Sequence, residues 1–341
     1  MKFIAYTTKG LEFVSEKEIS SKIFDAQIIE VGDKRIIFES NATFEKLTEL
    51  RTVDDLGLII QAIPTVETLD KLILEIDKID FNKIKKELDQ YREIASNNFS
   101  ITTGIVGVKN FVASDLVKIL SKSIYKKYNW SFTELDHTNL DIRIFIDRNI
   151  VYISVRLTKE SLQHRLYKTI SKEGSLKPTI AAAMVYLATD GKINLKIVDN
   201  FCGSGTVLAE SLLMGNQVCG GDIDPKSVII TRKNLANLGY DREEKVKHLN
   251  ATSTKWSNQQ FDAAVSNLPW GKQIELQSII KLYEGTISEY IRILKPDGII
   301  CVLISNPELF IKFVKKYKQN PDIKTFKIGL LGQNPTIVLV K

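Results

Sequence analysis

Short apolar runs alternate with helix-forming segments through residues 176–341, and this alternation constrains the fold more than any other feature. Strands are expected at Lys196–Asp199, Gln217–Asp222, 245–249, 263–266, 299–305 and Thr336–Val340. Strands that alternate with helices pair mostly in parallel, because each helical connection crosses one face of the sheet. The pattern therefore predicts an open α/β sheet that binds ligands at the carboxyl ends of its strands.

The first half of the chain is organised differently. Residues 1–62 and 63–165 each mix strand-like runs with amphipathic helices, which indicates two α+β domains, and Pro64 marks the boundary between them. Residues 166–175 are expected to link these domains to the C-terminal domain, residues 176–341. A chain of 341 residues is too long for one ordinary domain, so three domains are a reasonable division.

The composition excludes several protein classes. Hydrophobic residues make up 44% of the chain and charged residues 26%, which is typical of globular proteins. Since no run of 18 apolar residues and no signal peptide is recognisable, no membrane partner is expected. Three cysteines and three histidines are too few and too scattered for a disulfide framework or a metal site. A cytoplasmic protein without a metal is therefore expected.

Positive charge is concentrated beyond the first third of the chain. The net charge is −5 over residues 1–104, +6 over 105–180 and +5 over 181–341, which gives the total of +6. A polyanion such as a nucleic acid would contact the middle and C-terminal parts. Lysine-rich helix faces that only keep the protein soluble would give the same pattern.

The sequence Ile-Val-Asp-Asn-Phe-Cys-Gly-Ser-Gly-Thr at 197–206 is the most specific local feature. An apolar strand ends in Asp199, and a glycine loop leads into a helix. No Lys follows Gly205, which excludes the phosphate-binding loop, and Leu208 takes the place of the third dinucleotide-binding glycine. The pattern suits S-adenosyl-L-methionine, with Asp199 facing its amino group; a plain strand–turn–helix junction is the alternative. The loop residues expected to bind this cofactor are Phe201, Cys202, Gly203, Ser204 and Gly205.

Two later strand ends complete the expected cofactor site. Asp222 lies 17 residues after Gly205, where an acidic side chain can accept hydrogen bonds from both ribose hydroxyls, and Ile223 follows it. Asn250 and Ala251 follow the next strand and could meet the adenine, although Asn250 could equally be an ordinary loop residue.

The run Ser-Asn-Leu-Pro-Trp-Gly at 266–271 follows another expected strand. It resembles the Asn-Pro-Pro-Tyr motif of methyltransferases that modify planar exocyclic amines. The Asn267 side chain and the Leu268 carbonyl could accept both N–H bonds of such an amine, Pro269 would stiffen the loop, and Trp270 would stack on the base. A rigid loop with a core Trp is the alternative. Because no Cys follows Pro269, carbon methylation through a thiol is disfavoured.

Together these motifs resemble the THUMP-containing RNA guanosine N2-methyltransferases over nearly the whole chain. The resemblance is carried by Leu-Arg-Thr-Val-Asp at 50–54, Ser-Leu-Gln-His-Arg-Leu-Tyr at 161–167, Leu-Lys-Pro-Thr at 176–179 and the glycine loop, which departs from the family only at Asn200. It implies a ferredoxin-like domain at 1–62, a THUMP domain at 63–165 and a Rossmann-like class I methyltransferase domain at 176–341.

The resemblance also implies a function. The THUMP domain would hold the tRNA 3′ end, and the catalytic domain would methylate N2 of a guanosine with S-adenosyl-L-methionine. The Asn-Leu-Pro-Trp sequence favours position 6 of the acceptor stem; position 10 of tRNA and ribosomal RNA are the alternatives. A monomer is expected. Candidate contacts to RNA phosphates are Lys109, Lys118, Lys122, Lys126, Lys127, Arg165, Lys168, Lys172 and Lys177.

Two further hypotheses remain open from sequence. A DNA or protein amine methyltransferase could use the same pocket, although the first half of the chain argues against it. A non-catalytic RNA-binding protein with a vestigial cofactor fold is the other, and the intact Asp199, Asp222 and Asn267 argue against that.

Overall fold

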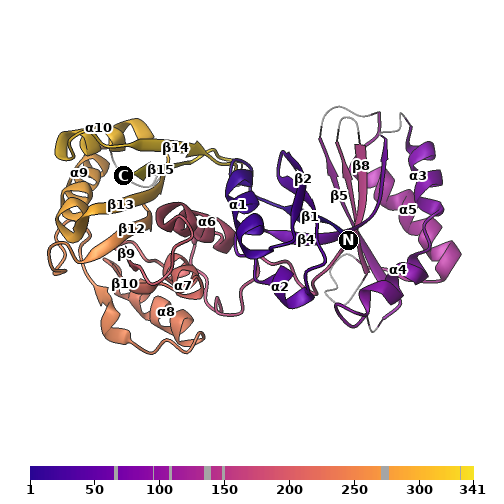
Figure 1. Cartoon of the computed structure of the whole chain (residues 1–341), viewed down its shortest axis with the longest axis horizontal. Coiled ribbons are helices and arrows are strands. Elements are labelled where there is room, and N and C mark those ends of the chain that lie inside the picture. Colours follow the sequence, from indigo (N-terminus) through magenta and orange to yellow (C-terminus); the bar gives the residue numbers. More distant parts are fainter. Residues whose placement is uncertain are drawn as a thin grey trace.

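The structure is a computed structural model that describes residues 1–64, 68–94, 96–106, 110–133, 140–147, 150–269, 276–330 and 332–341. Two β-sheets organise the described chain, one in each half (Figure 1). The first half contains β1 (Lys2–Tyr6), α1 (Glu12–Lys22), β2 (Gln27–Gly32), β3 (Arg35–Glu39), α2 (Phe44–Thr48), β4 (Asp55–Pro64), α3 (Leu69–Asp77), α4 (Phe81–Leu88), β5 (Asn98–Ile105), α5 (Ala113–Tyr128), β6 (Ser131–Phe132), β7 (Leu140–Ile146) and β8 (Ile150–Arg156).

The first sheet is continuous across the two expected α+β domains. Its eight strands have the order β2-β3-β1-β4-β8-β7-β5-β6, so β4 pairs with β1 on one side and with β8 on the other. The boundary expected between residues 62 and 63 therefore falls within a single strand. Residues from both segments, including Phe3, Leu58 and Ile153, share one buried hydrophobic core. Segments 1–62 and 63–165 are thus joined by main-chain pairing.

The segment after β4 forms two separate helices, α3 and α4. The first helix, α3, ends at Asp77, and the Asp80 side chain then accepts hydrogen bonds from the main-chain N–H groups of Asn82 and Lys83. A carboxylate in this position caps a new helix N-terminus and favours a break in the chain direction. Both helices place apolar faces in the core under the sheet.

The second half has the α/β architecture that the sequence predicts. It contains α6 (Pro178–Thr189), β9 (Lys196–Asp199), α7 (Thr206–Leu213), β10 (Gln217–Asp222), α8 (Pro225–Ala236), a 3-10 turn (Glu243–Lys245), β11 (Val246–His248), β12 (Phe261–Asn267), α9 (Leu276–Ile293), β13 (Leu294–Ile304), α10 (Pro307–Tyr317), β14 (Ile323–Lys327) and β15 (Thr336–Val340). The strand order is β11-β10-β9-β12-β13-β15-β14; among the described strands of this sheet, β13–β15 and β14–β15 pair antiparallel and the other neighbours pair in parallel.

The strand order of the second sheet fixes the position of the site. β9 and β12 are neighbours in the centre of the sheet and run parallel, so their carboxyl ends lie at the same edge. β10 pairs with β9 on its other side. Asp199, Asp222 and Asn267 each end one of these three strands, so all three lie at one edge, where open α/β sheets bind ligands.

The first 62 residues also pack against the second sheet. Leu11, which directly precedes α1, and Val14 of α1 share a hydrophobic core with residues of α6. The Phe13 ring stacks on that of Phe326, with 5.0 Å between the ring centroids. Figure 1 shows α1 beside α6, between the two halves of the molecule. The N-terminal segment therefore contacts both the first sheet and the second.

Candidate active site

Asp199, the last residue of β9, lies at the centre of the site and is 1% exposed. Its Oδ1 atom accepts hydrogen bonds from the Phe201 N–H at 3.0 Å and from the Ser266 hydroxyl at 2.7 Å. The Oδ2 atom accepts none from the described part of the chain. Burial, opposed by these two hydrogen bonds and aided by the nearby Asp222, raises the pKa of Asp199 to about 7.

Ser266 connects this acid to the expected amine-binding motif. Its hydroxyl also lies 2.7 Å from the hydroxyl of Tyr290, on α9. When Ser266 gives its single hydrogen to the Asp199 carboxylate, Tyr290 must be the donor of the second bond. Asn267, the first residue of the Asn-Leu-Pro motif, directly follows Ser266, whose hydroxyl donates a hydrogen bond to Asp199.

The glycine loop turns sharply between β9 and α7. Gly203 has φ +54°, and a Cβ atom added there would have the Phe201 carbonyl oxygen, at 4.0 Å, as its nearest neighbour. Gly205 has φ +82°, and a Cβ atom there would lie 2.9 Å from Cγ2 of Thr231. Gly203 thus leaves open space beside the loop, whereas Gly205 permits close packing of α7 against α8.

Two side chains of the loop face the protein. Cys202 is buried, burial raises the pKa of its thiol, and its sulfur accepts a hydrogen bond from the Thr231 hydroxyl at 3.4 Å. A buried thiol with a raised pKa favours a packing role for Cys202 over a nucleophilic one. The Ser204 hydroxyl is also buried and lies 2.6 Å from that of Ser175 in the linker.

Asp222 lies at the end of β10, beside the glycine loop. Its Oδ2 atom accepts a hydrogen bond from the Gly203 N–H at 2.9 Å, and its Oδ1 atom accepts one from the Asp224 N–H at 3.0 Å. Asp224 caps α8 by accepting a hydrogen bond from the Lys226 N–H. The following side chain, Ile223, is 68% exposed. A ring could pack against this apolar surface, next to the Asp222 carboxylate.

Asn250 has a local role in the structure. Its Oδ1 atom accepts hydrogen bonds from the N–H and the hydroxyl of Thr252, at 3.0 and 2.9 Å, which closes a turn after β11. Ala251 is buried. Contacts of Asn250 and Ala251 with an adenine stay a prediction.

The expected catalytic motif begins where β12 ends. Leu268 is fully buried, and its N–H donates to the Leu303 carbonyl at 3.2 Å. The Pro269 carbonyl accepts a hydrogen bond from the Tyr283 hydroxyl at 3.4 Å, and burial raises the pKa of Tyr283 to about 12. Trp270 lies outside the described residues. These contacts anchor the backbone that carries Asn267, whose catalytic role stays a prediction.

Asn200, the residue after Asp199, has a structural role that the sequence does not indicate. Asn200 is 1% exposed, and its Oδ1 atom accepts a hydrogen bond from the indole N–H of Trp256 at 3.0 Å. Its Nδ2 atom is buried without a hydrogen-bond partner among the described residues. Trp256 lies in the segment between β11 and β12, so Asn200 connects that segment to the start of the glycine loop. The one feature of the sequence that could have drawn attention to Asn200 is that it departs from the glycine loop of the resembled family.

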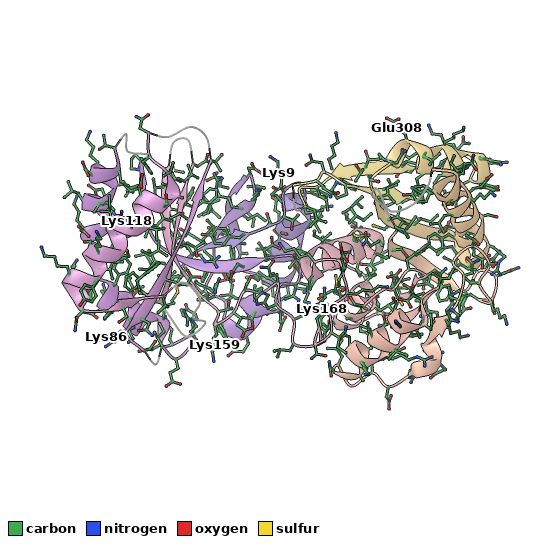
Figure 2. All side chains as sticks on the ribbon, turned by 180° about the vertical axis from the view of Figure 1, so that it is seen from behind. Lys9, Lys86, Lys118, Lys159, Lys168 and Glu308 are labelled. Atoms are coloured by element: carbon green, nitrogen blue, oxygen red, sulfur yellow. The ribbon has the colours of Figure 1, made fainter. Side chains whose placement is uncertain are left out.

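The expected RNA contacts fall into two groups. Lys118, Lys122 and Lys126 are exposed at four-residue intervals on α5, so they lie along one face of that helix (Figure 2 labels Lys118). Lys127 also is exposed, but its ammonium donates to the carbonyls of Asp77 and Ile79 at the end of α3. Lys109 lies outside the described residues.

The remaining expected contacts lie between residues 165 and 177 and bind other parts of the protein. Lys172 pairs with Asp224 at 2.8 Å, and Lys177 pairs with Asp54 at 2.7 Å. The Lys168 ammonium donates to the Leu176 carbonyl at 2.8 Å.

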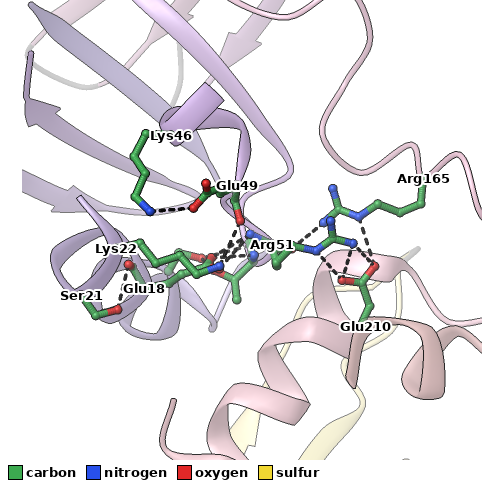
Figure 3. A network of polar contacts seen from close by, with 10 residues as sticks. Glu18, Ser21, Lys22, Lys46, Glu49, Arg51, Arg165 and Glu210 are labelled. Carbon is green, nitrogen blue, oxygen red and sulfur yellow. Dashed lines mark hydrogen bonds and ion pairs between the residues drawn. The ribbon is translucent and has the colours of Figure 1, made fainter. Parts of the chain in front are cut away.

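Arg165, whose contact with RNA stays a prediction, makes buried contacts within the protein. Only 6% of its side chain is exposed, and its Nε atom donates to Glu210 at 3.1 Å. Glu210 is a fully buried residue of α7 that also accepts two hydrogen bonds from Arg51 (Figure 3). It accepts one more from the Tyr167 hydroxyl. The charge of Arg165 is thus needed to neutralise a buried carboxylate.

The Glu210 contacts continue into the N-terminal segment. The Glu18 carboxylate, on α1, accepts hydrogen bonds from the main-chain N–H groups of Arg51 and Thr52 and from the Thr52 hydroxyl. Two buried carboxylates therefore hold the Arg51 backbone and side chain from opposite sides. We call Glu18, Arg51, Arg165, Tyr167 and Glu210 the junction network.

Among the helices in the described part of the chain, none has both the length and the apolar character needed to cross a bilayer.

Comparisons with known proteins agree with this architecture. Residues 165–331 match the family described as UPF0020, RMKL-like methyltransferase domain. The chain is similar in fold to the crystal structure of TrmN from Thermus thermophilus, with a TM-score of 0.83 over 100% of this chain and 99% of that one, at 18% sequence identity. That agreement extends through both sheets.

Curated relatives are similar at low sequence identity. A tRNA (guanine(6)-N2)-methyltransferase of Methanocaldococcus jannaschii is 23% identical, over 91% of this chain and 92% of its own length. Another protein of that name, from Archaeoglobus fulgidus, is 26% identical over 64% of this chain and 55% of its length. The U6 snRNA (guanine-N(2))-methyltransferase THUMPD2 of Bos taurus is 25% identical over 86% of this chain and 58% of its length. The chain spans little more than half of the last two relatives. The sequence prediction of a methyltransferase is confirmed, and the part of the chain that carries the second sheet, residues 165–331, is similar to the RMKL-like methyltransferase domain.

Proposed function

We propose that this chain transfers a methyl group from S-adenosyl-L-methionine to N2 of a guanosine in RNA, at position 6 of the tRNA acceptor stem. The observation that carries the proposal is the Asn-Leu-Pro sequence at the end of β12, joined through Ser266 to the acid that ends β9. Relatives named for guanine-N2 methylation of tRNA and of U6 snRNA cover most of this chain and support the same reaction.

The residues at the sheet edge fit this cofactor. The Oδ2 atom of Asp199 can accept a hydrogen bond from the cofactor amino group, and the open side of Gly203 leaves room for the methionine part. Asp222 can accept further bonds from the ribose hydroxyls, since each carboxylate oxygen has two lone pairs. Ile223 provides an exposed apolar surface beside it. When bound, the cofactor supplies an electrophilic methyl carbon.

Asn267 and the Leu268 carbonyl would orient the target amine. The lone pair of an exocyclic guanine nitrogen is delocalised into the ring, so the nitrogen is a poor nucleophile. Two acceptors that hold its N–H bonds favour a more tetrahedral nitrogen and direct the lone pair towards the methyl carbon. As the new N–C bond forms and the C–S bond breaks, the nitrogen loses one proton to water. A guanosine that is paired in a stem must first be flipped out.

The first half of the chain would hold the RNA. In this proposal residues 63–165 form a THUMP domain that binds the single-stranded 3′ end, residues 1–62 form the ferredoxin-like domain that fixes its position, and the protein acts as a cytoplasmic monomer. The exposed lysines of α5 supply positive charge on this half, and α1 packs against α6. The distance between the RNA end and the target base would then be set by the protein.

A nucleoside assay tests this function directly. Purified protein is incubated with methyl-labelled cofactor and an unmodified tRNA transcript with guanosine at positions 6 and 10, and the RNA is digested for mass spectrometry. We expect labelled N2-methylguanosine, lost when guanosine 6 is replaced by adenosine and kept when guanosine 10 is replaced. Label in a single-stranded DNA or a protein substrate, or loss only on replacement of guanosine 10, would contradict the proposal.

A further inference from the structure

A cavity lies in the linker between the two halves of the chain, outside the expected cofactor and amine sites. It has a volume of about 430 Å³, and apart from Pro178 its lining residues are polar: Gln163, His164, Arg165, Lys168, Ser171 and Lys177. One water molecule occupies about 30 Å³ in the liquid, so the cavity is large enough for a group the size of a phosphodiester with its sugar. Figure 2 shows Lys168 at the junction of the two halves.

The cavity wall has more positive than negative charge. Arg165 and Arg51 share the carboxylate of Glu210, and Lys177 pairs with Asp54. Lys168 has no carboxylate within 4 Å among the described residues. Three cations therefore line the cavity, and together with Arg51, Glu210 and Asp54, which are joined to two of them through ion pairs, they carry a net charge of +2.

Lys168 is the group in this wall that can bind an anion. Its ammonium donates one hydrogen bond, to the Leu176 carbonyl at 2.8 Å, so two of its three donor hydrogens are left. Burial lowers the pKa of Lys168, and the more distant Glu210 only partly opposes this effect. An anion in the cavity would compensate the cost of burying this ammonium. Arg165 also lines the cavity, but its guanidinium is already engaged by Glu210, so Lys168 has more free donor hydrogens for an anion.

We propose that the linker cavity binds a backbone phosphate of the RNA substrate, with Lys168 as its direct contact. The inference rests on the proposed function and adds a binding site to it. In this proposal, RNA held by the first half passes the linker and brings a base to the edge of the second sheet. A phosphodiester bound here would fix the RNA at a point between its 3′ end and the flipped base. Phosphate contacts of this kind determine register and carry no sequence information.

The test measures RNA binding as a function of salt. Lys168→Met removes the charge and keeps a similar side-chain volume. Lys159→Met is the matched control, because Lys159 is exposed on the first half and away from the cavity (Figure 2). The probe is a labelled acceptor-stem minihelix with guanosine at position 6 and a single-stranded 3′ end, titrated by fluorescence anisotropy between about 50 and 300 mM KCl.

We expect Lys168→Met to weaken binding roughly three- to tenfold and to reduce the slope of log affinity against log salt by about one. Lys159→Met should match the wild type, and Lys168→Arg should restore most of the slope. S-adenosyl-L-methionine affinity, measured by calorimetry, should be the same in all four proteins. This last measurement separates loss of a phosphate contact from a general distortion of the linker.

Two outcomes would distinguish failure of the cavity proposal from failure of the proposed function. If the wild type methylates the minihelix but Lys168→Met binds it with the slope of Lys159→Met, the cavity proposal is wrong and the proposed function stands. If the wild type neither binds nor methylates the minihelix or full-length tRNA, the proposed function fails, and the cavity proposal fails with it.

Discussion

The Arg51 guanidinium binds both oxygens of the Glu210 carboxylate, with its Nε atom 2.8 Å from Oε2 and its Nη2 atom 2.9 Å from Oε1. The two residues are 159 positions apart in the chain and lie on different halves of the molecule. Because α7 begins at the glycine loop, this ion pair connects the N-terminal segment to the helix that presents the expected cofactor loop. Figure 3 shows that Arg165 approaches the same carboxylate from the linker.

Replacement of Glu210 should destabilise the protein strongly. Glu210→Gln leaves the Arg51 and Arg165 charges without their buried counter-ion, and the free energy of unfolding should fall by about 3–5 kcal/mol. Glu49→Gln, which breaks an exposed pair with Lys46, should change it by less than about 1 kcal/mol. Urea denaturation measures both values. Similar small changes in the two variants would show that the junction network does not stabilise the fold.

Alanine variants of three glycines with positive φ should distinguish an effect on stability from an effect on cofactor affinity. Gly239→Ala meets no atom within 4 Å, so only the backbone cost of about 1–2 kcal/mol is expected, with unchanged cofactor affinity. Gly203→Ala should cost a similar amount but weaken S-adenosyl-L-methionine binding at least tenfold, because its methyl group enters the open space beside the loop.

Gly205→Ala should be the least stable of the three. Its methyl group would lie 2.9 Å from Thr231, which adds roughly 1–3 kcal/mol of overpacking to the backbone cost. Thermal denaturation and calorimetry with the cofactor measure the two effects separately. Equal cofactor affinity in Gly203→Ala and Gly239→Ala would contradict the assigned position of the cofactor.

Cofactor affinity should depend on pH through Asp199. Its carboxylate is protonated below a pKa of about 7, so affinity should fall towards tenfold per pH unit as the pH decreases from about 7 to 5.5. Ser266→Ala removes a hydrogen bond that lowers this pKa, and the midpoint of the pH profile should therefore move upward. Ser257→Ala, an exposed position, is the control. A flat profile from about pH 5.5 to 7.5 would refute the role of Asp199.

The same group should affect stability in the cofactor-free protein. The pKa of Asp199 is raised in the folded state from the ordinary value of 3.8, so the folded state holds a proton that the unfolded chain releases. The stability contributed by Asp199 is fully present below about pH 4 and is lost as the pH rises through about 7. Saturating cofactor should reverse part of this loss, which urea denaturation at several pH values can measure.

Asn267→Ala should abolish methyl transfer with little effect on cofactor binding. Loss of the side chain that orients the amine should lower kcat by at least about a hundredfold, a typical effect of removing one polar group that acts in the transition state. The dissociation constant for S-adenosyl-L-methionine should stay within about threefold of the wild type. Asn82→Ala, exposed on α4, is the control. Turnover close to that of the control would exclude Asn267 as the amine-orienting residue.

The expected site depends on short segments whose geometry is local. A buried parallel strand is an apolar run, and the polar residue that ends it lies at the carboxyl edge of the sheet whatever else the chain does. For this reason the ends of β9, β10 and β12, with Asp199, Asp222 and Asn267, can be located from the amino-acid sequence alone. The same reasoning does not predict β14, because the run Ile323–Lys327 mixes exposed and half-buried residues without a clear periodicity.

Sequence alone therefore determined the class of the second sheet, the glycine loop and the residues at the strand ends. Only the tertiary structure decided that β4 joins residues 1–62 and 63–165 into one sheet, that Tyr290 and Ser266 support Asp199, and that Glu210 accepts Arg51 and Arg165. These contacts join residues tens to more than a hundred positions apart. Burial and charge neutralisation in the folded protein determine which residues make these contacts, and a local sequence pattern does not contain that information.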